Sequence, residues 1–318
     1  MIIVISNREV NPGATDESLF GEKTNAKGPD EIRLAEAEFD KSTGGWRLNL
    51  LEEKNLTPEN RPSQKLFKRV IQGIKEKKFK SDWVFYIHGF NQSFKKTLDA
   101  GYEIAQKYDV EVILFSWASN PGGLVTVEYQ RAQQAAKASA NAIDRTLEML
   151  GRYLKDRPWP DVETCSVRFN LLAHSLGNYL LEHFVRNPVF SGETRIFDNI
   201  IFHQADVDNR RHRFWVDRVE HGRRLYITIN ENDSVLKASD LINPNRLGNT
   251  VNGLDSKRAI YLDFTGGKGV KREHNFFLGD HGNKSIEKFF RRVLTSRRGE
   301  LVAGLKPGEQ PNVFYLDS

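Results

Sequence analysis

The chain has 318 residues, of which 39% are apolar and 28% charged. This balance is typical of a globular protein with a sizeable core, and it excludes disorder over most of the length. The 47 Lys and Arg residues outnumber the 42 Asp and Glu residues, so the formal charge is +5. Such a modest excess permits an anionic partner without requiring one.

The sequence favours a cytoplasmic protein. The apolar run at residues 1–6 is too short for a signal peptide and has no basic region before it. No uncharged apolar stretch reaches the length of a transmembrane helix. The single cysteine, Cys165, cannot form an internal disulfide, which suits a reducing compartment; we interpret it as a small residue beside a strand.

Strand-like and helix-like segments alternate along the chain. Apolar runs of strand length lie at 2–6, 32–39, 46–51, 83–87, 110–115, 167–172, 196–202, 225–229 and 259–264. Helical periodicity is found at 66–74, 98–107, 127–155, 176–186 and 285–294. The polar, glycine-containing stretch that ends near residue 30 predicts no element.

This alternation predicts an α/β fold with a mostly parallel central sheet and helices on both faces. We expect one domain over residues 1–298, which includes an N-terminal β-strand region at about 1–55, followed by a C-terminal tail at 299–318. In such a sheet, function collects in the loops after the carboxyl ends of the strands.

Residues 173–177 read Ala-His-Ser-Leu-Gly and lie between a predicted strand and a predicted helix. They are similar to the nucleophile elbow G-x-S-x-G, in which small residues flank a serine on a tight turn because strand and helix crowd those positions. Ala173 stands in the first glycine position and is still small. The pattern predicts Ser175 as a nucleophile and the Leu176 N–H as an oxyanion donor; alternatively, Ser175 caps the helix.

A second turn follows the strand at 83–87, where residues 88–91 read His-Gly-Phe-Asn. Glycine allows a sharp turn after which the next amide can point into a site. We therefore predict the Phe90 N–H as the other oxyanion donor. The alternative is an ordinary strand-to-helix turn with a hydrogen-bonded histidine.

A serine nucleophile needs a base and an acid that orients the base. Asp233 follows the strand at 225–229 and is our predicted acid, although it could equally cap the next helix. Asp206 and Asp208 follow the preceding strand, and Asp206 is the alternative acid; turn capping would also explain this pair. No His, Cys or Asp spacing completes a metal site around them, so we expect no metal and no cofactor.

Two histidines lie between the last predicted strand and the last predicted helix. His281 sits among glycines, as at a flexible loop tip, whereas His274 is followed by Phe276 and Phe277, which would anchor it. Because a general base must be held in place, we favour His274 and keep His281 as the alternative. The resulting order of Ser, Asp and His along the chain is that of α/β-hydrolases.

Taken together, these motifs resemble the α/β-hydrolase superfamily, and in particular a poorly characterised bacterial subgroup of esterase- or lipase-like proteins. The resemblance covers residues 1 to about 295. It rests on S-N-R at 6–8, H-G-F-N at 88–91, F-S-W at 115–117, A-H-S-L-G-N at 173–178, D-V-D at 206–208 and N-D at 232–233. The subgroup's final H-S-x-F motif is matched better by His274 than by His281.

The predicted activity is hydrolysis of an ester or related acyl bond of a small-molecule substrate through an acyl-enzyme on Ser175. An acyltransferase or a thioesterase would use the same residues. A catalytically silent binding or nucleic-acid-associated protein is the alternative from another class, although we expect no nucleic acid. Residues 209–224 hold six arginines, which could recognise an anionic substrate or a membrane surface, or form a solvated helix face. The oligomeric state is not determined by the sequence.

Overall fold

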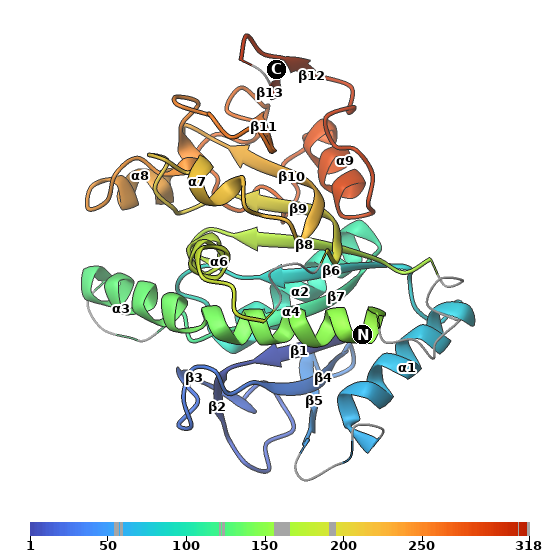
Figure 1. The fold of residues 1–318 in the computed structure, drawn as a ribbon. Helices are drawn as coiled ribbons and strands as arrows, with labels where there is room; N and C mark the ends of the chain where they lie inside the picture. The colour runs from blue at the N-terminus through green and yellow to red at the C-terminus, as the bar shows by residue number, and fades with distance from the viewer. Residues whose placement is uncertain are drawn as a thin grey trace.

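The computed structural model describes residues 1–53, 57, 60–120, 122, 125–155, 166–190, 195–310 and 312–316. One 11-stranded sheet runs through the molecule, in the order β12-β13-β11-β10-β9-β8-β6-β7-β1-β4-β5 (Figure 1). Its strands are β1 (Ile2–Ser6), β4 (Arg33–Asp40), β5 (Gly45–Leu51), β6 (Asp82–Ile87), β7 (Glu111–Ser116), β8 (Arg168–His174), β9 (Phe197–His203), β10 (Gly222–Ile229), β11 (Ala259–Asp263), β12 (Leu305–Pro307) and β13 (Val313–Leu316).

The sheet is parallel from β1 to β13 and antiparallel only at its two edges. All neighbouring pairs between these two strands are parallel, whereas β4 pairs antiparallel with β1, β5 with β4, and β12 with β13. The predicted fold class, a mostly parallel α/β sheet, is therefore confirmed. The segment from residue 299 onward contributes β12 and β13 to this sheet.

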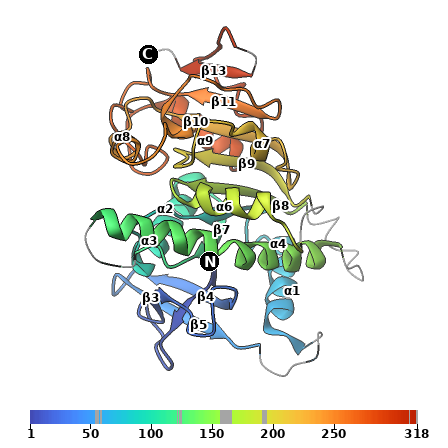
Figure 2. The same ribbon diagram turned by 60° about the vertical axis from the view of Figure 1, so that its left-hand side comes forward.

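Helices cover both faces of the sheet (Figure 2). Side chains of α1 (Pro62–Lys75), α3 (Val125–Ala138), α4 (Ala140–Lys155) and α6 (Gly177–Arg186) pack in the core of one face. Those of α2 (Phe94–Tyr108) and α9 (Lys284–Val293) pack in the core of the other. Three short elements, α7 (Arg213–Val216), α8 (Ser234–Asp240) and the 3-10 turn η2 (Leu247–Asn249), lie in the connections after β9 and β10.

Strand β6 shows why the central runs are apolar without interruption. Trp83, Phe85 and Ile87 enter the core on one face, while Val84 and Tyr86 enter the core on the other. Successive strand side chains point to opposite faces, so a strand that is covered on both sides needs an apolar residue at each position.

The single helix expected over 127–155 is two helices, with Ser139 between α3 and α4. The Ser139 hydroxyl donates to the Ala135 carbonyl at 2.7 Å and accepts from Asn7 Nδ2 at 2.8 Å. A serine bonded back to its own helix often bends that helix, and the tie to Asn7 fixes the bend against the end of β1. The helical spacing of apolar residues continues across the break at Ser139, which is why the sequence pattern did not reveal the break.

The stretch before residue 30 also differs from expectation, because it holds a small hairpin of β2 (Arg8–Val10) and β3 (Phe20–Thr24). Phe20 packs edge-on against Phe94 of α2, with ring centroids 5.0 Å apart. This tertiary contact stabilises a strand that local sequence does not predict. Cys165 lies outside the described residues.

Candidate active site

Ser175 lies at the end of β8, on the turn into α6, with φ of 53°. This left-handed conformation is costly for a residue with a side chain and persists only where the surroundings impose it. Its N–H donates to the His203 carbonyl at 3.0 Å, and its own carbonyl accepts from the amides of Asn178 at 3.0 Å and Asp206 at 3.2 Å. The end of β9 therefore holds the turn in its strained form.

Two glycines make room for this turn. A Cβ added to Gly89 would lie 2.7 Å from the Ser175 Cβ, and one added to Gly177 would lie 2.7 Å from the His88 carbonyl oxygen. Both distances are far below van der Waals contact, so neither position can carry a side chain without displacing its neighbour. Ala173, at the other end of the elbow, is completely buried.

The turn after β6 is braced by the segment that follows β7. The Trp117 amide donates to His88 Nε2 at 3.1 Å, which leaves the proton on Nδ1, and Nδ1 donates to the Gly89 carbonyl at 3.0 Å. The Trp117 ring stacks on the imidazole, with centroids 5.5 Å apart. Burial lowers the pKa of His88 well below its usual 6.5, so the ring is neutral. Its two hydrogen bonds hold the turn after β6 against the segment that follows β7.

Two backbone amides, one directly after Gly89 and one directly after Ser175, lack an acceptor among the described residues. In the described part of the chain, neither the Phe90 N–H nor the Leu176 N–H donates a hydrogen bond to protein. Leu176 is completely buried. Buried amides are nearly always paired, so the unpaired Leu176 amide next to a strained serine is unusual.

Asp233 is completely buried and uses both carboxylate oxygens. Its Oδ1 accepts from the amides of Val235 at 2.8 Å and Leu236 at 3.1 Å, which caps α8. Its Oδ2 accepts from His274 Nδ1 at 2.6 Å. The same carboxylate therefore caps a helix and forms a hydrogen bond with His274.

Two residues that the sequence analysis did not single out support this pair. Gln204 Nε2 donates to Asp233 Oδ2 at 2.7 Å, and Asn230 Nδ2 donates to the carbonyls of Lys271 at 3.1 Å and Glu273 at 3.0 Å. Asn230 thereby fixes the loop that delivers His274. Both residues directly follow a strand, at the carboxyl edge of the sheet. Polar residues at this edge are the ones expected to have a function, and this position is the signal in the sequence that points to them.

His274 lies beside the elbow. Its ring centroid is 4.6 Å from that of His174, the residue before Ser175, and its backbone carbonyl is 3.3 Å from His174 Nε2. Within the described residues, neither the Ser175 hydroxyl nor His274 Nε2 forms a hydrogen bond, so both remain free for a substrate or for each other. In sites without ligand such pairs are often separated and close only when substrate binds.

The other candidates make different contacts. Asp206 accepts from the hydroxyls of Tyr129 at 2.9 Å and Ser239 at 2.8 Å, and burial raises the pKa of its carboxyl. Asp208 caps the amide of Arg210 at 2.8 Å. His281 Nε2 lies 2.6 Å from the Leu278 carbonyl, and no hydrogen bond joins His281 to an acid among the residues that the structure describes.

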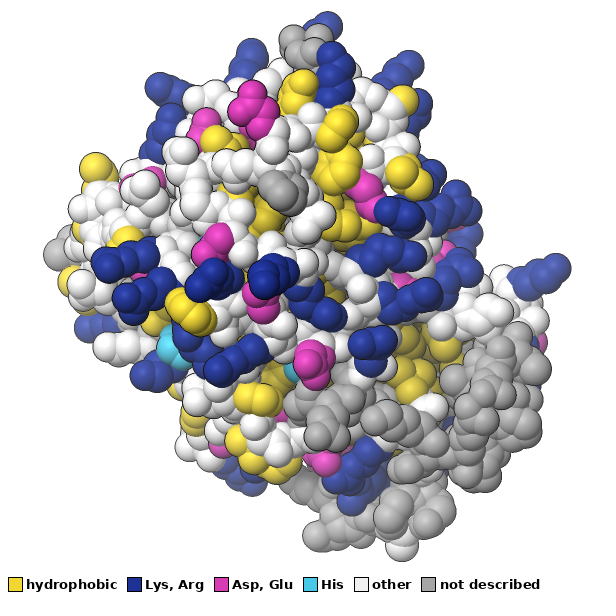
Figure 3. Space-filling model, turned by 45° about the horizontal axis from the view of Figure 1, so that its top comes forward, with side chains coloured by type: hydrophobic (Ala, Val, Ile, Leu, Met, Phe, Trp, Pro, Cys, Tyr) yellow, Lys and Arg dark blue, Asp and Glu magenta, His cyan; other side chains and the backbone are white. Residues whose placement is uncertain are grey.

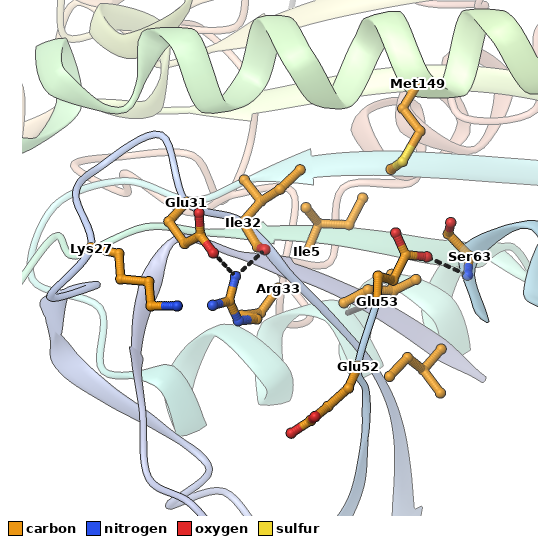
Figure 4. Close-up of a pocket in the computed structure, with 11 residues that line it drawn as sticks. Ile5, Lys27, Glu31, Ile32, Arg33, Glu52, Glu53, Ser63 and Met149 are labelled. Atoms are coloured by element: carbon orange, nitrogen blue, oxygen red, sulfur yellow. Dashed lines mark hydrogen bonds and ion pairs between the residues drawn. The ribbon is translucent and has the colours of Figure 1, made fainter. Parts of the chain in front are cut away.

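A cavity of about 280 Å³ lies away from this site, between the N-terminal strands and α4 (Figure 4). Arg33 and Glu31 are paired at its wall, and Glu53 accepts from the Ser63 amide across from Met149. None of the residues around Ser175 lines it. The described residues also hold no group of three side chains able to bind a metal ion.

The parallel sheet and the serine elbow at its carboxyl edge define an α/β-hydrolase fold. The model of the family "Alpha/beta hydrolase of unknown function (DUF900)" matches residues 63–262, so the chain belongs to that family. The matched part includes Ser175 and Asp233 and ends before His274. No curated protein matches the sequence. No helix among the described residues is long and apolar enough to cross a membrane.

Proposed function

We propose that the protein is a serine hydrolase that cleaves an ester or related acyl bond through an acyl-enzyme on Ser175. The observation that carries this proposal is the hydrogen bond from His274 to the buried Asp233, beside a serine held at positive φ. Neither a cap nor a core contact requires an imidazole at this place. The two amides without an acceptor, Phe90 and Leu176, support the same conclusion because they offer an oxyanion hole.

In the first half of the reaction, Ser175 Oγ attacks the acyl carbonyl carbon while His274 Nε2 takes the hydroxyl proton. The carbonyl oxygen becomes an oxyanion, and the amides of Phe90 and Leu176 stabilise its charge. Asp233 keeps the His274 proton on Nδ1, so that Nε2 is the basic nitrogen, and it stabilises the imidazolium. Collapse of the tetrahedral intermediate breaks the bond to the alcohol, which leaves with the proton from His274.

In the second half, water takes the place of the alcohol. His274 Nε2 removes a proton from the water as it attacks the acyl-enzyme carbonyl, and the oxyanion forms in the same hole. The intermediate then releases the carboxylic acid and returns the proton to Ser175 Oγ. An acyltransferase or thioesterase reaction on this site differs only in the acceptor or in the leaving group.

Covalent labelling tests the proposal. A fluorophosphonate probe reacts with serines that an adjacent base activates, and mass spectrometry locates the adduct. We expect one adduct, on Ser175, and none in a folded Ser175→Ala protein. The absence of labelling in a correctly folded wild-type protein, together with no turnover of short p-nitrophenyl esters, would favour the non-catalytic alternative.

A further inference from the structure

Exposed apolar side chains gather on helix α8 and on the residues that follow it. Within the described residues, nine large apolar side chains are exposed, and three of them lie between residues 235 and 242. They are Val235, Leu241 and Ile242, and Leu241 is 84% exposed. Single exposed apolar residues are common on protein surfaces, but a local concentration of them marks an interaction surface.

The loop after α8 lies beside the basic segment that follows β9. The Asn209 amide donates to the Asn245 carbonyl at 2.9 Å, and Asp208 forms a β-bridge with Arg246. The loop after α8 therefore lies against the start of the segment that leads into α7. We call the surface formed by Val235, Leu241 and Ile242, with the cations around them, the docking face.

The cations of the docking face are exposed and unpaired. They are Arg210, Arg211, Lys237 and Arg272, and none forms an ion pair with a described residue. Arg272 lies beside α8, because its carbonyl accepts from the Ser234 amide. Figure 3, which looks onto the C-terminal half of the molecule, shows many Lys and Arg side chains with hydrophobic and a smaller number of acidic ones among them.

The docking face is connected directly to the candidate active site. Helix α8 begins after Asp233, which binds His274, and Ser239 on its buried side donates to Asp206 at 2.8 Å. The Asp206 amide in turn donates to the Ser175 carbonyl. The helix that carries the docking face is thus linked to Ser175 through Ser239 and Asp206.

We propose that the docking face binds an anionic lipid bilayer. Exposed apolar side chains gain free energy by entering the acyl region, while Lys and Arg bind acidic headgroups. A nucleic acid would pair with the cations but would leave Leu241 and Ile242 in water, so a bilayer fits the whole surface better. Resting on the proposed function, the inference further assigns acyl esters of membrane lipids as the substrate class of Ser175.

Vesicle co-sedimentation tests the binding. The full chain is mixed with vesicles of pure phosphatidylcholine, or of phosphatidylcholine and phosphatidylglycerol in equal parts. We expect binding to the anionic vesicles alone, and about tenfold weaker binding for the Leu241→Ser/Ile242→Ser protein because two inserting side chains are lost. The matched control is Val189→Ser/Leu301→Ser, which removes two apolar side chains of 67% and 62% exposure on other elements.

Several results would overturn the inference. These are wild-type protein that stays in the supernatant with both vesicles, equal losses in the test and control variants, or tight binding of a single-stranded oligonucleotide without vesicle binding. Ser175→Ala protein should bind vesicles as wild type does. Vesicle binding without probe labelling would reject the proposed function alone, whereas labelling without vesicle binding would reject the docking face alone.

Discussion

His274 Nδ1 lies 2.6 Å from Oδ2 of Asp233, while Oδ1 of the same carboxylate caps helix α8. An ionised carboxylate can only accept hydrogen bonds, so Nδ1 carries the proton and Nε2 is left as the basic nitrogen. The cap fixes the carboxylate, and the carboxylate fixes the imidazole. Local helix capping and long-range positioning are thereby coupled through one side chain.

Replacing each of the two loop histidines in a separate variant distinguishes their roles. His274→Gln should lower kcat on a soluble ester by about 10⁴-fold or more, because the base that accepts the Ser175 proton is lost. His281→Gln, whose ring contacts the Leu278 carbonyl, should stay within a few-fold of wild type. Steady-state kinetics on both proteins decides this; a larger loss in the His281 variant would transfer the assignment to that residue.

Asp233→Asn should separate the cap from the catalytic role. Asparagine caps helices as well as aspartate does, so the melting temperature should change little. The amide now donates toward Nδ1 and favours the wrong imidazole tautomer, and comparable exchanges in Ser-His-Asp triads cost about 10⁴-fold in kcat. Gln204 can adapt, since its buried Oε1 has no partner.

The control for this prediction is Asp206→Asn, which alters the acid that binds Tyr129 and Ser239. Kinetics and thermal melting are measured on both variants. A smaller loss of kcat for Asp233→Asn than for Asp206→Asn would contradict the assignment of Asp233.

Gly89→Ala should impair the reaction while the fold survives. The added Cβ would meet the Ser175 Cβ at 2.7 Å, so the serine or the Phe90 amide must shift. Loss of one oxyanion donor typically costs about 10²- to 10³-fold in kcat. Gly45→Ala is the control, because its nearest neighbour, the Thr43 hydroxyl, lies at 3.6 Å. Circular dichroism monitors folding, and an active Gly89→Ala enzyme would argue against this turn as part of the site.

Stability should fall as the pH is lowered from 7 toward 5. Burial lowers the pKa of His88, His174 and His203 well below 6.5, so the folded protein keeps them neutral while the unfolded chain protonates them. The unfolded state therefore binds more protons, and the free energy of unfolding decreases by at most about 4 kcal/mol per pH unit for three groups.

Urea unfolding at several pH values measures this dependence. His203→Leu removes one titrating ring, whose Nε2 is buried without a partner, and should reduce the slope by at most about 1.4 kcal/mol per pH unit. An unfolding free energy that stays constant between pH 7 and 5 would show that these rings do not titrate on unfolding.

The sequence predicted the sheet well, because its strands are covered on both faces and must be apolar throughout, as β6 is. It did not predict the β2–β3 hairpin, the break at Ser139, or the strands β12 and β13 in the expected C-terminal tail. Phe20 in the hairpin and Ser139 are held by distant partners, Phe94 and Asn7 respectively, which no local pattern reveals.

The elbow was visible in the sequence because its requirements are local. A small residue, a serine and a glycine between a strand and a helix follow from steric crowding within five residues. What the sequence left open was which histidine meets Asp233. His274 and His281 are seven positions apart in one loop, and the loop's path is set by Asn230 and by the packing of Phe276 and Phe277.

The sequence by itself thus determined the α/β architecture and the order of the chemically relevant loops, since both follow from hydrophobic pattern and local turn geometry. Only the tertiary structure decided that Asp233 binds His274 and that the loop after α8 lies beside the segment that begins at Asp208. Such relationships depend on contacts between residues far apart in the chain, and these form only when the sheet brings the strand ends together.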